Sequence, residues 1–468
     1  MLDSIRAGER MLDWPERIGP SVRHCIVAFR KEGDDGLAQD SEAFAKLQAL
    51  VEKREESLFL EILVHDPASV SLFENCDLKP IECMPFTLEG RWAESLFGPG
   101  GLVHLDGEGI AYADNRKVHL VLFGMTPAAE ALAVETLKAA HFPNYIRDHS
   151  LRTRITWISP GAPAFGVRFT NRYKSLMDAS FYRFVDLDKE EIRLHSPDHD
   201  GRLEDFVDVE WEFVQATGLE ELVRTKLKLW TDPASGWRTV VAFAGPEDGR
   251  NIEYYQSLRN DLRDAPVLVH VRNDALVKAA GLPVIPFGMP WGCIRNTLLK
   301  RRIGMAVNAV YASTARDKHI PLGLDMEEAE RLWAELPGRF RRASLDNAQS
   351  LGSKMRSLGL QEEDWKVLYG IDADSAGQLA EVEHNRWSVA TLLSGMRPTT
   401  AEEQAAVEKD ISLKRTLKAQ GIHYDLRAYS DLRVDDMGND ARLYDKALTE
   451  CLPLIAHAVT VGEDGTGA

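Results

Sequence analysis

The stretch VHLVLFGMTPAAEALAVETLKAAHF at residues 118–142 decides the fold of this chain. It opens with the apolar run VHLVLFG (118–124), which is typical of a strand buried on both faces of a sheet. A helical pattern follows at 126–142, with Thr126 in the N-cap position and Pro127 in the first turn. A buried strand followed at once by a helix is half of a βαβ unit, so we expect a parallel sheet.

Five further strands are expected after this unit, and segments of helical period such as NIEYYQSLRNDLRDA (251–265) lie between them. Six strands with intervening helices predict a doubly wound, Rossmann-like parallel sheet. The five strands are expected at RITWIS (154–159), VDVEWEFV (207–214), WRTVVAFAG (237–245), PVLVHV (266–271) and VIPFG (284–288).

The chain divides into three expected domains. Residues 1–115, with buried runs at 24–29 and 58–66, predict a small Rossmann-like α/β domain. Residues 116–300 contain the six-stranded pattern. Residues 301–468 have no strong strand pattern and predict a mainly helical domain.

Composition narrows the class of protein. The 468 residues are 44% apolar and 28% charged, which is typical of globular chains, and the net charge of −17 argues against a broad surface for duplex nucleic acid. We find no signal-peptide core and no apolar run of the roughly 20 residues that a membrane span needs. We therefore expect a soluble, cytoplasmic protein. The cysteines are scattered, without a CxxC pair, and are expected to be reduced: Cys25, Cys76, Cys83, Cys293 and Cys451.

The first strand-to-helix turn lacks most of a dinucleotide motif. Of a GxGxxG pattern only Gly124 is present, and Ser159 stands where an acid for the ribose is expected. Intact NAD binding is therefore not expected, although Gly124, Thr126 and the helix N-terminus leave another nucleotide open. The string HSPDHD (195–200) is interpreted as a solvated loop, so we expect no metal site and assign no certain cofactor.

The charged segment EVEHNRW (381–387) has two interpretations. On a helix, Glu383 and Trp387 are neighbours four residues apart. The segment is then either a structural helix with Trp387 half in the core and its charges in water, or a helix that reads a ligand.

Four motifs in the last third of the chain resemble the RyR domain, the repeat first described in ryanodine receptors and also found in bacterial proteins. Met396 stands where that family has a tryptophan. The upstream stretch 118–142 resembles TrkA-N-type domains that regulate potassium uptake, which often precede an RyR domain in bacterial proteins. The four matching motifs are EVEHNRW (381–387), GMRP (395–398), AYSDL (428–432) and YDKAL (444–448).

The resemblance implies a bacterial sensor of a small nucleotide-derived signal, as in antiviral defence. Aromatic side chains would stack on a base and arginines would bind phosphate. Arg386→Ala is then expected to weaken binding with little change in melting temperature. The residues implied in ligand binding are Glu383, His384, Arg386, Trp387, Arg397, Arg427, Tyr429, Asp431 and Tyr444.

Two other functions stay open: a nucleotide-dependent enzyme that uses the Rossmann-like domain for redox or hydrolytic chemistry, and a scaffold without a ligand. A homo-oligomer is also expected, because PVIPFGMPWGCI (283–294) offers Phe287, Met289 and Trp291 after the last strand. The alternative is that these side chains cover the sheet edge of their own chain.

Overall fold

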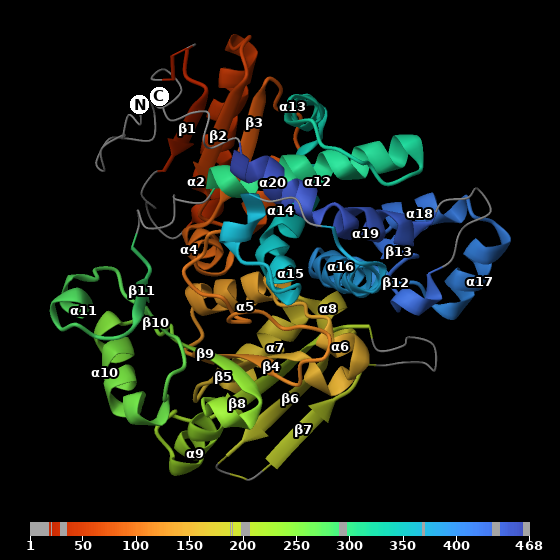
Figure 1. The fold of residues 1–468 in the computed structure, drawn as a ribbon. Coiled ribbons are helices and arrows are strands. Elements are labelled where there is room, and N and C mark those ends of the chain that lie inside the picture. Colours follow the sequence, from red (N-terminus) through yellow and green to blue (C-terminus); the bar gives the residue numbers. More distant parts are fainter. Residues whose placement is uncertain are drawn as a thin grey trace.

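The computed structural model describes residues 18–19, 21–28, 35–187, 189, 191–197, 206–289, 297–366, 370–432 and 440–461. An eight-stranded, mostly parallel sheet lies at one end of the molecule, and a three-stranded parallel sheet lies at the other (Figure 1). Helices from the last third of the chain pack between and beside the two sheets. The fold is therefore α/β with a large, mostly parallel sheet, as the sequence predicts.

The large sheet is built outward from its first strand, β4 (Lys117–Phe123). The others are β5 (Thr153–Ile158), β6 (Phe181–Asp186), β7 (Glu191–His195), β8 (Val209–Gln215), β9 (Trp237–Phe243), β10 (Val267–His270) and β11 (Ile285–Phe287). Their order is β11-β10-β9-β4-β5-β8-β6-β7, and only β6 and β7 pair antiparallel. The strands β5 to β8 lie on one side of β4, and the strands β9 to β11, which follow them in the chain, lie on its other side. The direction of winding therefore reverses between β4 and β9.

All six strands expected between residues 118 and 288 are present in this one sheet, which confirms that prediction. The edge hairpin β6–β7 was not expected. β7 (EIRLH) is almost fully exposed and β6 (FYRFVD) is mostly half-buried. Neither strand has the continuous apolar run by which a central parallel strand is recognised.

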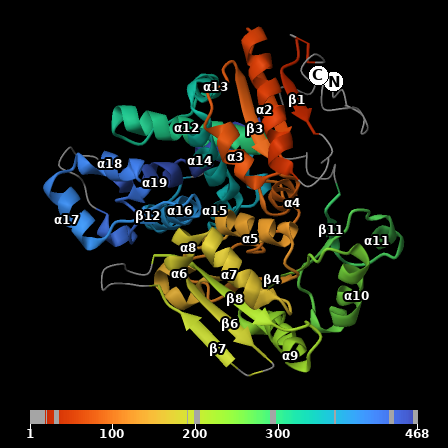
Figure 2. The same cartoon turned by 180° about the vertical axis from the view of Figure 1, so that it is seen from behind.

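Helices cover both faces of the large sheet (Figure 2). One face packs against α4 (Leu88–Phe97), α5 (Pro127–Ala139) and α7 (Ala162–Arg172), and the opposite face packs against α9 (Glu221–Trp230) and α10 (Asp248–Leu258). The central strands are mostly apolar because they are buried on both sides, and the buried polar side chains of His119, Thr156 and Glu212 are hydrogen-bonded to one another in a chain. Three short helices complete this part: α6 (Asn144–Arg147), α8 (Lys174–Asp178) and α11 (Ala275–Ala279).

The small sheet has the order β1-β2-β3, all parallel. Its elements are β1 (His24–Val27), α2 (Gly36–Lys53), β2 (Leu58–Leu63), α3 (Pro67–Glu74) and β3 (Ile81–Phe86). The expected runs at 24–29 and 58–66 account for the first two strands. β3 (IECMPF) was missed, since its apolar residues are interrupted by Glu82 and Pro85.

The last third is helical, apart from the two-residue strands β12 (Arg397–Pro398) and β13 (Ile422–His423), which pair with each other. The long helix α16 contacts α14 on one side, α19 on another, and α5, α6 and α8 of the large-sheet part. The helices are α12 (Thr297–Asp317), α13 (Met326–Glu335), α14 (Gly338–Gln349), α15 (Leu351–Ser357), α16 (Ala373–Leu393), α17 (Ala401–Lys409), α18 (Leu413–Ala419), α19 (Ala441–Glu450) and α20 (Leu452–Val461).

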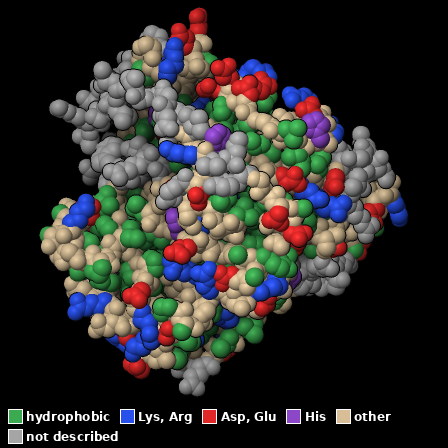
Figure 3. All heavy atoms as spheres, in the orientation of Figure 1, with side chains coloured by type: hydrophobic (Ala, Val, Ile, Leu, Met, Phe, Trp, Pro, Cys, Tyr) green, Lys and Arg blue, Asp and Glu red, His purple; other side chains and the backbone are tan. Residues whose placement is uncertain are grey.

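Acidic and basic side chains intermingle on the face seen in Figure 3. Across the described residues, no helix combines the length and the apolar character that crossing a membrane requires.

Candidate functional site

The helix α16 begins at Asp372, whose carboxylate accepts a hydrogen bond from the backbone N–H of Ser375. It is buried on nearly all sides rather than on one stripe. Glu383, His384 and Arg386 are only 1–3% exposed. Three of the charged residues of EVEHNRW, Glu383, His384 and Arg386, are therefore inside the protein and Glu381 is half-buried, so the interpretation of them as the wet face of a helix is wrong.

Glu383 and Arg386 form a buried ionic cluster with Lys354 of α15. Arg386 donates from Nε and Nη2 to the two carboxylate oxygens of Glu383, at 2.9 and 2.7 Å, and Lys354 pairs with the same carboxylate. Burial alone would raise the pKa of Glu383, but the charges of Arg386 and Lys354 outweigh it and bring the pKa to about 2. The guanidinium of Arg386 is thus bound within the protein.

His384 is the centre of a second cluster. Its Nε2 donates to the backbone carbonyl of Arg427 at 2.9 Å, and its Nδ1 lies 3.4 Å from a carboxylate oxygen of Asp445 on α19. Burial lowers the pKa of His384, yet the hydrogen bond and charge of Asp445 outweigh burial, so the pKa is raised. Acceptors at both nitrogens of an imidazole favour its protonated form.

Aromatic rings surround the imidazole of His384. The ring centroid of Trp387 lies 5.5 Å from that of His384, and the ring of Tyr429 lies 5.7 Å from it. Trp387 also meets His423 edge to face at 4.9 Å. The guanidinium of Arg427 lies 4.0 Å above the ring of Tyr424. We call these residues, together with Asp445, the His384 site.

Two donors of the His384 site have no partner in the described part of the chain. They are the Nη2 of Arg427, a residue that is 7% exposed, and the hydroxyl of Tyr429. Buried polar groups are nearly always hydrogen-bonded, so an unpaired donor of this kind calls for a ligand or a water molecule. Arg427 and Tyr429 can therefore each offer a hydrogen bond to a bound water molecule or ligand.

The remaining predicted residues lie elsewhere. Arg397 forms a bidentate pair with Glu403 of α17, at 2.7 and 2.8 Å. Tyr444 stacks on Tyr311 of α12, with ring centroids 4.7 Å apart. Asp431 is exposed in the short 3-10 turn Tyr429–Asp431. Of the nine predicted residues, the structure brings together His384, Trp387, Arg427 and Tyr429.

Sequence reasoning missed four residues that shape these clusters: Lys354, His423, Tyr424 and Asp445. The signal for Asp445 was within the motif YDKAL, where it follows Tyr444. Lys354 pairs with Glu383, which lies 29 positions away in the sequence, and no local sequence pattern predicts that contact.

The turn after β4 is closed against the end of β9. Gly124 has a φ of +109°, and a Cβ at this position would lie 2.7 Å from the carbonyl oxygen of Ala244. The Thr126 hydroxyl donates to that same carbonyl at 2.6 Å and accepts from the N–H of Ala129 at 3.2 Å. Thr126 therefore caps α5 as expected, and its side chain is used in joining two strands at the point where the winding reverses.

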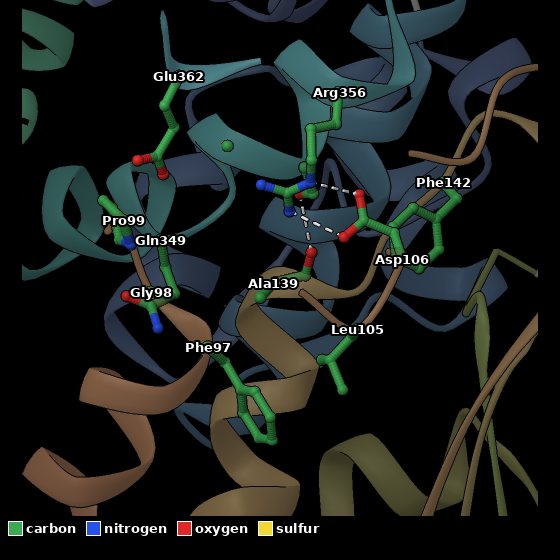
Figure 4. Close-up of a pocket in the computed structure, with 12 residues that line it drawn as sticks. Phe97, Gly98, Pro99, Leu105, Asp106, Ala139, Phe142, Gln349, Arg356 and Glu362 are labelled. Atoms are coloured by element: carbon green, nitrogen blue, oxygen red, sulfur yellow. Dashed lines mark hydrogen bonds and ion pairs between the residues drawn. The ribbon is translucent and has the colours of Figure 1, made fainter. Parts of the chain in front are cut away.

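Figure 4 shows a small cavity where the loop after α4 meets α5 and α15. Arg356 faces Asp106 across it with two hydrogen bonds, of 2.8 and 3.0 Å. The amide of Gln349 is buried there, and neither its nitrogen nor its oxygen has a hydrogen-bond partner among the described residues. The open volume is about 10 Å³, which is room for about one water molecule. A nucleotide does not fit.

No cluster of three or more potential metal ligands occurs among the described residues. His195 stacks on Tyr182 at the end of β7, whereas the rest of HSPDHD from residue 198 onward lies outside the described residues. The four described cysteines are free. Phe287 is buried in the core and the carbonyl of Met289 accepts from the indole N–H of Trp92, so both serve their own chain; Trp291 lies outside the described residues.

None of the protein-family models, curated proteins or solved structures compared with this chain matches it.

Proposed function

We propose that this protein is a ligand-sensing regulatory protein whose C-terminal part, of RyR type, binds a small nucleotide-derived signal at the His384 site. The observation that carries the proposal is that two buried donors, Arg427 Nη2 and the Tyr429 hydroxyl, have no partner among the described residues and belong to residues that contact His384. Phosphate oxygens are suitable acceptors for both donors. We also propose that the C-terminal part is an RyR domain and that the protein acts in bacterial antiviral defence.

In this proposal the large sheet is a Rossmann-like domain that supports sensing rather than catalysis. Its winding reverses between β4 and β9, which is where sheets of this kind bind nucleotides. However, Thr126 and Gly124 fill that point with contacts to Ala244. The enzyme alternative would need this turn to open. Transmission of the signal through association of chains is a further part of the proposal, and light scattering with and without ligand tests it.

The test is a thermal-shift screen of the full chain against a panel of mono-, di- and cyclic nucleotides. A nucleotide at 100 times its Kd is expected to stabilise the protein by about 2.7 kcal/mol. Arg427→Gln and Tyr429→Phe are expected to weaken the binding of the active nucleotide, because the first removes the charged guanidinium and the second removes a hydroxyl donor. Tyr444→Phe is the matched control, since Tyr444 stacks on Tyr311 outside the site. If no nucleotide stabilises the chain, or if Tyr429→Phe and Tyr444→Phe behave alike, the proposal fails.

A further inference from the structure

A groove lies between the segment that joins α3 to β3 and the connection from α13 to α14. The two segments come from the small sheet and from the helical part, and Figure 1 shows α13 beside β3. The groove encloses about 260 Å³, close to the lower end of the range for small-molecule sites. It is distinct from the His384 site, which is built by α16, α19 and the chain around Arg427.

Three cations line the groove without a counter-ion. In the part of the chain that the structure describes, no carboxylate oxygen pairs with the side chain of Lys79, Arg339 or Arg341, although all three contribute to the wall. Lys79 and Arg339 are exposed and Arg341 is half-buried. Burial lowers the pKa of Arg341, although the negative charge of Glu82 opposes that effect.

The acids near these cations are mostly engaged elsewhere. Glu74 pairs with Arg342 at 3.5 Å and Glu335 pairs with Arg331 at 3.3 Å. Both arginine partners lie outside the lining of the groove. Of the lining acids, only Asp77 has no such pair among the described residues.

Arg341 is held in one orientation. Its Nε donates to the carbonyl of Trp333 at 3.1 Å, and its Nη2 donates to the carbonyl of Ala334 at 3.2 Å. Its other terminal nitrogen, Nη1, donates to no described residue. A guanidinium fixed at two points with one free end is prepared to bind an oxyanion.

The charges also oppose the usual preference at a helix start. α14 begins beside the groove after Pro337, without a side-chain cap and without an acid in its first turn, and instead carries Arg339 and Arg341. The positive end of a helix dipole favours anions and disfavours cations. A bound anion would be stabilised by both the arginines and the dipole.

We propose that this groove binds a small organic anion, a carboxylate or phosphate monoester with an apolar body. Lys79, Arg339 and Arg341 bind the anionic group, and Phe73 and Leu336 of the lining contact the apolar body. This proposal stands on its own observations and does not rest on the function proposed above.

The experiment measures binding of three probes to the full chain by calorimetry: phenyl phosphate, benzoate and uncharged phenol. At least one anion is expected to bind and phenol is not, and the relative affinities of the two anions tell a phosphate site from a carboxylate site. Arg339→Gln is expected to weaken binding about tenfold, the effect of one charge-assisted hydrogen bond. Because Arg339 is exposed, this variant is expected to fold. Arg316→Gln is the matched control, since Arg316 is an exposed arginine on α12 paired with Asp317.

A second measurement tests whether the probe binds in this groove. Cys76 lines the groove and is exposed, so the bound anion is expected to slow its alkylation by iodoacetamide, while Cys25 of β1 reacts at an unchanged rate. Tyr429→Phe is expected to leave the affinity for the probe unchanged, which separates this groove from the His384 site. The proposal is overturned if neither anion binds, if Arg339→Gln binds as tightly as the parent chain, or if Cys76 is not protected.

Discussion

Glu383→Gln is expected to destabilise the protein by about 3 kcal/mol. The carboxylate of Glu383 is 1% exposed and is the shared counter-ion of Lys354 and Arg386. Its pKa of about 2, against 4.5 for a free glutamate, corresponds to about 3 kcal/mol at roughly 1.4 kcal/mol per pH unit. Removing one partner of a buried ion pair has a similar effect, about 3–5 kcal/mol, because the remaining charges stay buried without compensation.

Urea denaturation followed by tryptophan fluorescence measures this loss as a shift of the transition midpoint. Because the folded pKa is depressed, the stabilisation is fully present above pH 4.5 and is lost as the pH falls from 4.5 toward 2. Glu383→Gln should therefore flatten the acid limb of the stability profile. The matched control is Glu191→Gln, which removes a carboxylate from an exposed pair with Arg193 and should leave the midpoint unchanged. If the two variants unfold at the same urea concentration, the buried cluster does not contribute as argued.

The pKa of His384 is raised in the folded protein by its pair with Asp445. The stabilisation from this pair is therefore expected to be complete below pH 6.5 and to be lost as the pH rises through the folded pKa. An NMR titration should show that Asp445→Asn lowers the pKa of His384. A His384 pKa that does not respond to Asp445→Asn would contradict the pairing. Gly124→Ala is expected to destabilise by more than about 1 kcal/mol in thermal unfolding, because φ is +109° and the added Cβ would lie 2.7 Å from the Ala244 carbonyl oxygen. Gly249→Ala, where a Cβ meets nothing within 4 Å on α10, is its control and should not destabilise.

The large sheet was predictable from the sequence because its central strands are buried on both faces. Such strands are apolar over most of their length, so VHLVLF and VVAFA are visible as runs. Edge strands lack that requirement. β7 pairs with a single neighbouring strand, β6. The alternation of polar and apolar residues in its sequence, EIRLH, is equally compatible with a loop.

The candidate site was predictable only in part, because a sequence shows spacing along a helix and not what surrounds the helix. Arg386 was expected to face a ligand with little effect on folding. The structure instead pairs it with Glu383, whose carboxylate also binds Lys354 of another helix. The change Arg386→Ala is therefore expected to lower the free energy of unfolding, which revises the expectation from sequence. His384 and Tyr429 were both identified because each belongs to one of the motifs that resemble the RyR domain, EVEHNRW and AYSDL.

The buried charges of α14 connect the regions that carry the two proposed ligand sites. Asp346 lies 3.3 Å from Arg342 on α14 and 3.6 Å from Lys138 on α5, and its charge also acts on Arg386 of α16. Arg342 in turn reaches Glu74, at the rim of the groove. A ligand that moved α16 would thus change the electrostatic potential at Arg342 and Glu74 beside the groove. Because coupling between two binding sites is reciprocal, a ligand in the groove would also affect binding at the His384 site. The affinity for phenyl phosphate should then change when the nucleotide is bound, and equal affinities in its presence and absence would show that the two sites act independently.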